Sequence, residues 1–374
     1  VGGLLLSLGT RLVVAGHDLA PGPYALLYHY APGFRSVRYP ERFALVLVLG
    51  LAPLVALGLA RLRSRALGAA ACALLFLEHF SAPLPLEPLP GPAHAPSVYR
   101  WLAGRAEVHV VAEVPSSRNW MERSDGLPMY FSTLHWKKTP QGFTGYFPPA
   151  SNFIRWRLFH FPDAESVAFL RRLGVDTVVV RAQQGRAPAW AVAGADWDVA
   201  GPFAEGDVVL RLRGVDGLAF APPAAEPEAG LVEVDRATWR VFASHPDPGL
   251  ARDGREDTAW TTDQAARIDD HYGVRFTEPV ALALIALEVR DPFEFPTRLE
   301  VAGRTAAGED VVFPYDRAAA YDDLFASLLY RPRRARLLLK VETPPLKELR
   351  LRLADNDHFQ LPWTLAELRL YRRP

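Results

Sequence analysis

The feature that most constrains this chain is an unbroken apolar run of about 18 residues, from Phe43 to Ala60, the length of a helix that crosses the hydrocarbon core of a bilayer. Pro53 lies inside the run, and a membrane helix tolerates it because neighbouring groups satisfy the freed carbonyl. Three arginines follow in a short connection, and a second apolar run extends from Ala66 to Leu77. The pattern predicts a transmembrane α-helical hairpin.

The charge balance excludes one class of partner. Basic and acidic residues number 42 each, whereas a nucleic-acid-binding protein shows a basic excess. The single cysteine, Cys72, lies in the second apolar run, so no disulfide can form within the chain. The chain starts with an apolar stretch instead of the charged start of a signal peptide. We therefore expect it to be the C-terminal part of a longer membrane protein.

The arginines of two loops predict the orientation of the hairpin. Positive charge favours the cytoplasmic side, and it is densest in the turn from Arg61 to Arg65. We expect that turn to be cytoplasmic. The loop from Arg11 to Arg42 and the polar remainder after Ser81 would then lie on the extracytoplasmic face of the inner or plasma membrane.

The loop that precedes the first apolar run carries Arg35, Arg38 and Arg42 after a cluster of aromatic residues. Guanidinium groups hold phosphates by paired hydrogen bonds, so these arginines are candidates for binding a lipid phosphate. The alternative is an interfacial belt, in which the arginine stems lie along apolar surface and only the charged ends reach water.

Composition divides the rest of the chain. Proline-rich segments at 81–97 and 215–230 read as linkers. Between them, strands expected at 108–114, 176–181 and 208–212 alternate with helices at 98–102 and 164–173, which indicates a small α/β domain over 98–214. After the second linker, short alternating strands with turn residues between them predict a C-terminal β-sandwich of jelly-roll type over 231–374. The expected fold is thus multidomain, with residues 1–80 forming the transmembrane helices and the outer-face loop.

A long loop rich in aromatic residues is expected within the α/β domain, from Met129 to Pro149. Glu113 ends the first strand, and His135, Lys137 and Tyr146 belong to the loop. Together they are candidates for a polar site that binds a sugar or a phosphate. The alternative is that the aromatic residues cap the domain or lie on the membrane surface.

Several short motifs of residues 1–214 form a set: Pro32-Gly33-Phe34, Arg42-Phe43, Val98-Tyr99-Arg100-Trp101-Leu102, Glu113-Val114-Pro115 and the stretch from Met129 to Trp136. As a set they resemble the C-terminal half of bacterial multi-spanning proteins of the GT-C glycosyltransferase superfamily. The resemblance implies transfer of a sugar from a polyprenyl-phosphate donor. The acidic catalytic loop of that superfamily would precede Val1, so the catalytic residues of this chain are unknown.

A second motif, Asp253-Gly254-Arg255-Glu256-Asp257-Thr258-Ala259-Trp260, looks like the turn of a discoidin, or galactose-binding-like, domain. In that family the turn and a late glutamate often build a calcium site. Calcium prefers hard oxygen ligands, which Asp253, Asp257, Thr258 and Glu367 could supply. The alternative is that Asp253 and Thr258 only stabilise the turn and Trp260 belongs to the core. The polar run from Asp355 to His358 is typical of a solvated turn.

Two functions follow from these patterns. The first is an integral membrane glycosyltransferase-like protein that acts on lipid-linked sugars. The alternative is a membrane-tethered module that binds carbohydrate or another surface partner without catalysis. No nucleophile elbow and no His-Glu-x-x-His pair supports a hydrolase.

Overall fold

The structure is a computed structural model of the whole chain. It describes residues 1–14, 17–37, 39–80, 91–116, 126–142, 148–183, 185–224, 229–255, 257–262, 265–289, 294–332, 335–355 and 361–374. The chain forms two compact units, Val1–Leu89 and Pro90–Pro374.

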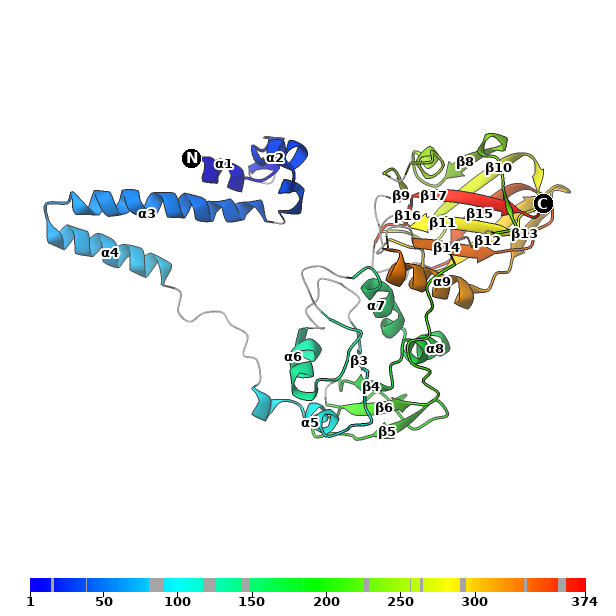
Figure 1. Cartoon of the computed structure of the whole chain (residues 1–374), viewed down its shortest axis with the longest axis horizontal. Helices are drawn as coiled ribbons and strands as arrows, with labels where there is room; N and C mark the ends of the chain where they lie inside the picture. Colours follow the sequence, from blue (N-terminus) through cyan, green and yellow to red (C-terminus); the bar gives the residue numbers. More distant parts are fainter. Residues whose placement is uncertain are drawn as a thin grey trace. The chain divides into compact units, whose positions relative to one another are not determined.

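The first unit is built around one long apolar helix (Figure 1). Its elements are α1 (Gly2–Ser7), β1 (Arg11–Val14), β2 (His17–Pro21), α2 (Tyr24–Tyr30), η1 (Phe34–Ser36), η2 (Pro40–Phe43), α3 (Ala44–Ala60) and α4 (Arg65–His79). With η2 included, the helix over Pro40–Ala60 has 21 residues, a mean hydropathy of 2.6 in its most apolar window, and no part of that window buried. Among the described residues it alone is long and apolar enough to cross a membrane.

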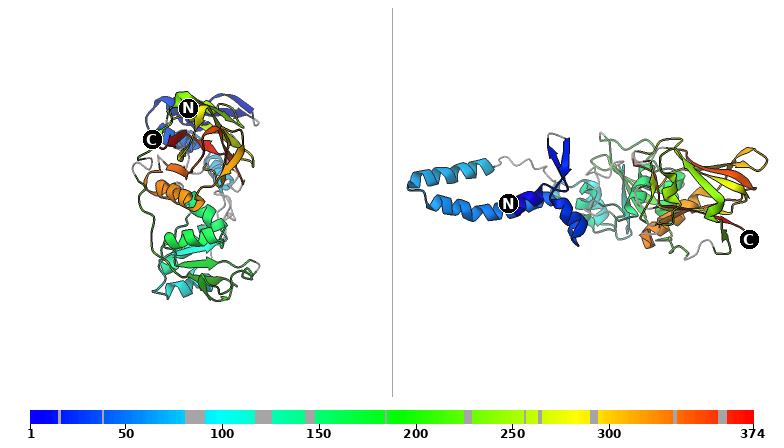
Figure 2. Two further views of the ribbon diagram at one scale, coloured as in Figure 1. Left: turned by 90° about the vertical axis from the view of Figure 1, so that its right-hand side faces the viewer. Right: turned by 90° about the horizontal axis from the view of Figure 1, so that it is seen from above.

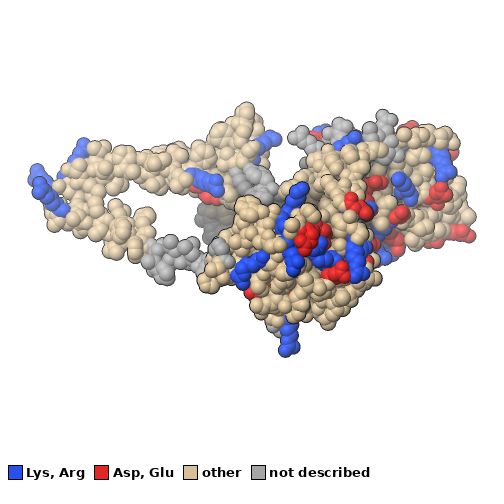
Figure 3. All heavy atoms as spheres, turned by 60° about the horizontal axis from the view of Figure 1, so that its bottom comes forward, with Lys and Arg blue, Asp and Glu red and all other residues tan. Residues whose placement is uncertain are grey.

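The chain turns back between α3 and α4 (Figures 1 and 2). Arg61, Arg63 and Arg65 lie at this turn, and the surface of the two helices beyond it is almost free of charge (Figure 3). α4 has only 15 residues, whereas about 20 are needed to span a bilayer. The second span of the predicted hairpin therefore stays a prediction.

The second unit begins with the α/β part, whose elements are η3 (Pro92–His94), α5 (Ser97–Ala103), β3 (Val111–Val114), α6 (Gly126–His135), α7 (Ser151–Phe159), α8 (Ala164–Arg172), β4 (Thr177–Val180), β5 (Trp197–Ala200) and β6 (Val208–Leu212). They form a sheet in the order β3-β4-β6-β5, in which β3 and β4 are parallel and the other pairs antiparallel. β3 and β4 are buried on both faces, because helices cover the two sides of the sheet.

One expectation for this part was wrong. The stretch from Met129 to His135, expected to be loop, belongs to the helix α6. Phe131 and His135 lie one helical turn apart, and both are buried against the helix α5 side of the sheet. The helix forms because this face packs into the core, which outweighs the loop-like local composition.

The second unit ends in an antiparallel β-sandwich. Its elements are β7 (Val232–Glu233), η5 (Arg236–Thr238), β8 (Trp239–Ala243), η6 (Pro248–Ala251), β9 (Trp260–Thr261), β10 (His271–Val280), β11 (Leu284–Val289), β12 (Leu299–Thr305), β13 (Asp310–Phe313), α9 (Arg317–Tyr330), β14 (Ala335–Lys340), β15 (Leu346–Leu353), β16 (Thr364–Leu365) and β17 (Glu367–Arg372). The main sheets run β13-β12-β15-β10-β8 and β14-β11-β17-β7. The predicted C-terminal sandwich is confirmed.

The alternation of side chains explains why these strands pair face to face. In β15, Leu349, Leu351 and Leu353 point into the core, while Lys347 and Arg350 face solvent. A β-sandwich needs this period of two residues, because each sheet buries one face against the other.

The sandwich and the α/β part share one hydrophobic core, which the described residues of both contribute to. Phe153 of α7 and Phe169 of α8 contact Phe325 of α9, with ring centroids 5.1 and 4.8 Å apart. Ion pairs border the contact, such as the 3.2 Å pair between Arg317 Nη1 and Glu165 Oε1. The boundary predicted at 215–230 includes residues outside the described ones, and the five-part division of the chain stays a prediction.

Candidate functional site

Arg35 and Arg42, two of the arginines predicted to bind a lipid phosphate, are occupied by local contacts. Arg35 donates from Nε to the carbonyl oxygen of Tyr28, 3.2 Å away, and the guanidinium of Arg42 lies 5.1 Å from the ring centre of Tyr39. Arg38 lies outside the described residues. These contacts are of the kind expected for an interfacial belt. The phosphate role stays a prediction.

The predicted polar site of the α/β part is organised by a residue that the sequence did not single out, Tyr99 of α5. Its buried hydroxyl donates to Glu113 Oε2, 2.9 Å away, and accepts from Arg181 Nη1 at 2.8 Å. The ring of His135 stacks on the ring of Tyr99, with centroids 6.0 Å apart. Glu113 and His135 are therefore brought together, with Tyr99 between them.

The other two residues of the predicted polar site do not join this cluster. Lys137 donates from Nζ to the carbonyl oxygen of Arg105 at 2.6 Å, although its main-chain N–H reaches His135 Nδ1 at 3.0 Å. Tyr146 lies outside the described residues.

The cluster lies at the carboxyl edge of the parallel strands, where open α/β sheets bind their ligands. Arg181 follows β4 and donates its main-chain N–H to Val114 of β3, at 2.8 Å. Buried Asp207, before β6, holds Arg181 Nε at 3.4 Å and accepts from the N–H of Ala182 at 2.7 Å. The sequence signal that could have located Arg181 and Asp207 is the position of charged residues directly beside buried strands.

Burial sets the protonation states in this cluster. Burial first, and then the neighbouring Glu113 carboxylate, raise the pKa of Tyr99 well above its usual range. Burial, together with the charge of Lys137, lowers the pKa of His135 to about 4. His135 is therefore neutral at pH 7, and its Nδ1 accepts the hydrogen bond from Lys137.

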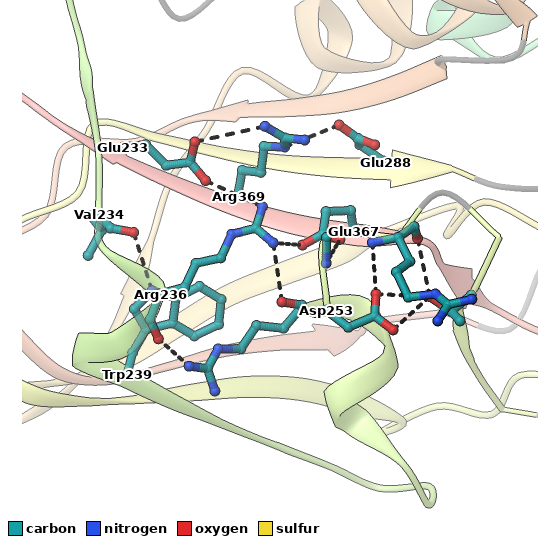
Figure 4. Close-up of polar contacts among 12 residues, drawn as sticks. Glu233, Val234, Arg236, Trp239, Asp253, Glu288, Glu367 and Arg369 are labelled. Atoms are coloured by element: carbon teal, nitrogen blue, oxygen red, sulfur yellow. Dashed lines mark hydrogen bonds and ion pairs between the residues drawn. The ribbon is translucent and has the colours of Figure 1, made fainter.

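The turn that was expected to bind calcium is closed by hydrogen bonds from the protein (Figure 4). Asp253 Oδ1 accepts from the N–H of Arg255 and from the hydroxyl of Thr258, both at 2.9 Å. Asp257 pairs with Arg255, with Oδ2 and Nη2 2.9 Å apart. Trp260 is buried, so these contacts are those of the alternative in which the turn is stabilised locally.

Glu367, the last residue of the predicted calcium set, is buried in β17 and pairs with Arg236. Its Oε1 lies 2.6 Å from Arg236 Nη1, and its Oε2 accepts from the N–H of Gly254 at 3.0 Å. Within the part of the chain that the structure describes, no group of three or more His, Cys, Asp or Glu side chains is placed to hold a metal ion. The calcium site stays a prediction.

The sequence did not point to an open groove at the end of the sandwich where β7, β10 and β17 meet their loops. Its volume is about 890 Å³, and its lining includes three threonines and the charged residues Glu233, Asp235, Glu278, Glu342, Arg372 and Arg373.

Most charges of this groove are already paired. Arg373 pairs with Glu342, and Glu233 lies 3.5 Å from Arg236. Glu278 and Arg372 are exposed and have no hydrogen-bond or ion-pair partner among the described residues. Their side chains are available to a ligand.

The polar run from Asp355 to His358 is only partly described, since residues 356–360 are outside the described ranges. Asp355 accepts a hydrogen bond from the hydroxyl of Thr297 at 2.6 Å, which ties the start of the run to the sandwich.

No family model and no curated protein matches the chain. Among solved structures, the chain is similar to the F5/8 type C domain of a Bacteroides fragilis protein, at 20% identity over 39% of this chain and 98% of that one, with a TM-score of 0.31. It is also similar to the family 32 carbohydrate-binding module of Clostridium perfringens NanJ, solved with galactose, at 12% identity over 38% and 99%, with a TM-score of 0.29. A third is the family 32 module of AlyQ, solved with 4,5-unsaturated mannuronic acid, at 12% identity over 37% and 97%, with a TM-score of 0.28.

Proposed function

We propose that this protein is a membrane-anchored carbohydrate-binding protein, in which the open groove of the sandwich binds a neutral glycan. The observation that supports this function most directly is the groove of about 890 Å³ with two unpaired, exposed charged side chains of opposite sign, Glu278 and Arg372. Clefts of roughly 300–1,000 Å³ are the usual size for small-molecule ligands.

The chemistry of the lining favours a polyhydroxylated ligand. A sugar hydroxyl both donates and accepts, so one ring can bond a carboxylate and a guanidinium at the same time. Most charges of the groove are paired within the protein, and the two side chains unpaired among the described residues, Glu278 and Arg372, have opposite signs, so no excess of positive charge is present to attract a phosphorylated or carboxylated ligand. The groove therefore selects neutral sugars.

The anchor is the helix over Pro40–Ala60. Its surface is apolar on all sides and unburied, which in water would cost free energy in proportion to the exposed apolar area. A bilayer removes that cost. If α4 crosses back as the second span of the predicted hairpin, and the Arg61 to Arg65 turn is cytoplasmic, residues 90–374 lie on the extracytoplasmic face, where surface glycans are found. Sugar transfer from a polyprenyl-phosphate donor stays a prediction from the resemblance.

The test uses the full chain in detergent on an array of neutral and acidic glycans, followed by calorimetric titration of the glycans that bind. Neutral glycans are expected to bind. The double variant Glu278→Ala, Arg372→Ala is expected to bind them at least about tenfold more weakly, because hydrogen bonds to charged groups contribute about 1.5–3 kcal/mol.

The matched control changes the same residue types elsewhere on the sandwich. Glu309→Ala and Arg298→Ala remove exposed charges outside the groove, and they are expected to leave the affinity unchanged. An array without bound glycan, or equal affinity of the groove and control variants, would refute the proposed function.

A further inference from the structure

A guanidinium nitrogen already contacts Glu367, one of the four residues expected to bind calcium (Figure 4). Arg236 Nη1 lies 2.6 Å from Glu367 Oε1 and donates to the carbonyl oxygen of Arg252 at 3.2 Å. Calcium takes carboxylate and carbonyl oxygens of this kind at 2.3–2.6 Å. The guanidinium therefore excludes the ion from these two oxygens by its volume and by its charge. The residues present do not fit a calcium ion.

The carboxylate of Glu367, which Arg236 pairs with, is buried. Glu367 is 4% exposed, and a buried carboxylate is costly unless it is paired and hydrogen-bonded. Burial raises the pKa of Glu367 and Arg236 opposes that rise. Oε1 is paired with Arg236, and Oε2 accepts from the N–H of Gly254 at 3.0 Å. Both oxygens thus have partners supplied by the chain itself.

The guanidinium is also held in place. Arg236 and Arg252 each donate to the main-chain carbonyl oxygen of the other. The Arg252 guanidinium lies 4.8 Å from the ring centre of buried Trp239, at the start of β8. This exchange joins η5 to the segment that enters the 253–258 turn. These contacts hold the guanidinium of Arg236 in position for its ion pair with Glu367.

We propose that Arg236 replaces a structural metal ion in the sandwich. Its guanidinium binds Glu367 of β17 and the carbonyl oxygen of Arg252, and it thereby joins β17 to the segment that contains Arg252 and Gly254. The sandwich then keeps this turn ordered in the absence of calcium. Replacing Arg236 by a neutral residue removes the ion-pair partner of a buried carboxylate and frees that carboxylate and the Arg252 carbonyl oxygen, two hard oxygens of the kind that calcium binds.

The test is amide hydrogen exchange of the peptide that contains Gly254, measured on the full chain in detergent with CaCl₂ or with EGTA. The wild-type chain is expected to show the same protection in both. Arg236→Gln is expected to exchange about tenfold or more faster in EGTA, and CaCl₂ is expected to restore its protection. Arg236→Lys keeps the charge and is expected to retain most of the protection.

Arg240→Gln is the matched control, because Arg240 is an exposed arginine of the neighbouring strand β8 without a partner among the described residues. It is expected to match the wild type. Faster exchange of the wild type in EGTA overturns the proposal, as does wild-type protection in Arg236→Gln. The proposal is equally overturned if Arg236→Gln does not respond to CaCl₂, or if the Lys and Gln variants lose protection equally.

Discussion

Phe153 of α7 and Phe325 of α9 lie with ring centroids 5.1 Å apart, and both rings are fully buried. Phe153 belongs to the α/β part and Phe325 to the sandwich, so this contact continues one core through both. Phe220, in the segment between them, also reaches Phe325, at 4.7 Å.

The first prediction concerns this shared core. Phe325→Ala is expected to lower the free energy of unfolding by about 3–5 kcal/mol, the usual cost of deleting a buried phenylalanine ring. Because the ring contacts both parts, they are expected to unfold together in one transition. Urea denaturation followed by tryptophan fluorescence and by far-UV circular dichroism measures both quantities.

The control is Val312→Ala, which shortens an exposed side chain of β13 and is expected to change the free energy of unfolding by no more than about 0.5 kcal/mol. If tryptophan fluorescence and far-UV circular dichroism instead report two transitions at different urea concentrations, the two parts do not share a cooperative core.

The strands of the sandwich could be predicted because alternation is a local signal. The alternating strands expected over 231–374 appear as β8, β10 and β15 among others, and the strand expected at 208–212 in the α/β part has the bounds that the structure shows. The helix α7 could not be predicted in this way. It is buried on nearly all sides, Arg155 and Arg157 included, so its sequence carries no polar face from which a helical period could be recognised.

The candidate sites divide along the same line. The hydrogen bond between Asp253 and Thr258 joins residues of one turn, and the motif was sufficient to expect it. The pairing of Arg236 with Glu367 and that of Tyr99 with Arg181 each join a helix to a distant strand or strand end, and these segments meet only in the folded chain. A single sequence does not show which distant segments come together, so it cannot indicate which cationic side chain pairs with which carboxylate.

The second prediction concerns the hydroxyl that Glu113 and Arg181 share. Tyr99→Phe keeps the ring stack but removes the donor to Glu113 and the acceptor for Arg181. Loss of a hydrogen bond that leaves a buried charged partner costs about 1–3 kcal/mol, and the free energy of unfolding is expected to fall by that amount. Tyr30→Phe, at an exposed tyrosine, is the control. Equal stability of the two variants would contradict a structural role for the shared hydroxyl.

The third prediction concerns pH. His135 has a pKa of about 4 in the folded chain, below the usual value of about 6.5, so the unfolded chain binds the proton first as the pH falls. The free energy of unfolding is therefore expected to decrease from pH 6.5 to 4, and protonation would also break the bond that Nδ1 accepts from Lys137.

His135→Gln supplies an acceptor that does not titrate, and it is expected to flatten the decrease measured by urea denaturation across this pH range. The control is His17→Gln, at an exposed histidine of β2. If His135→Gln follows the wild-type pH profile, the acid sensitivity arises elsewhere.

The last prediction concerns the anchor. Leu51 lies near the middle of α3 on a helix with no buried face, and an arginine at the centre of a membrane helix costs about 2.5–3.5 kcal/mol on insertion scales. In cells that express the chain, Leu51→Arg is expected to shift protein from the carbonate-resistant membrane fraction to the extract. Leu329→Arg makes the same exchange on α9, at a partly exposed position of the sandwich, and is expected to leave the distribution unchanged. Because the control adds the same charge outside the apolar helix, equal retention of both variants would mean that α3 does not hold the protein in the bilayer.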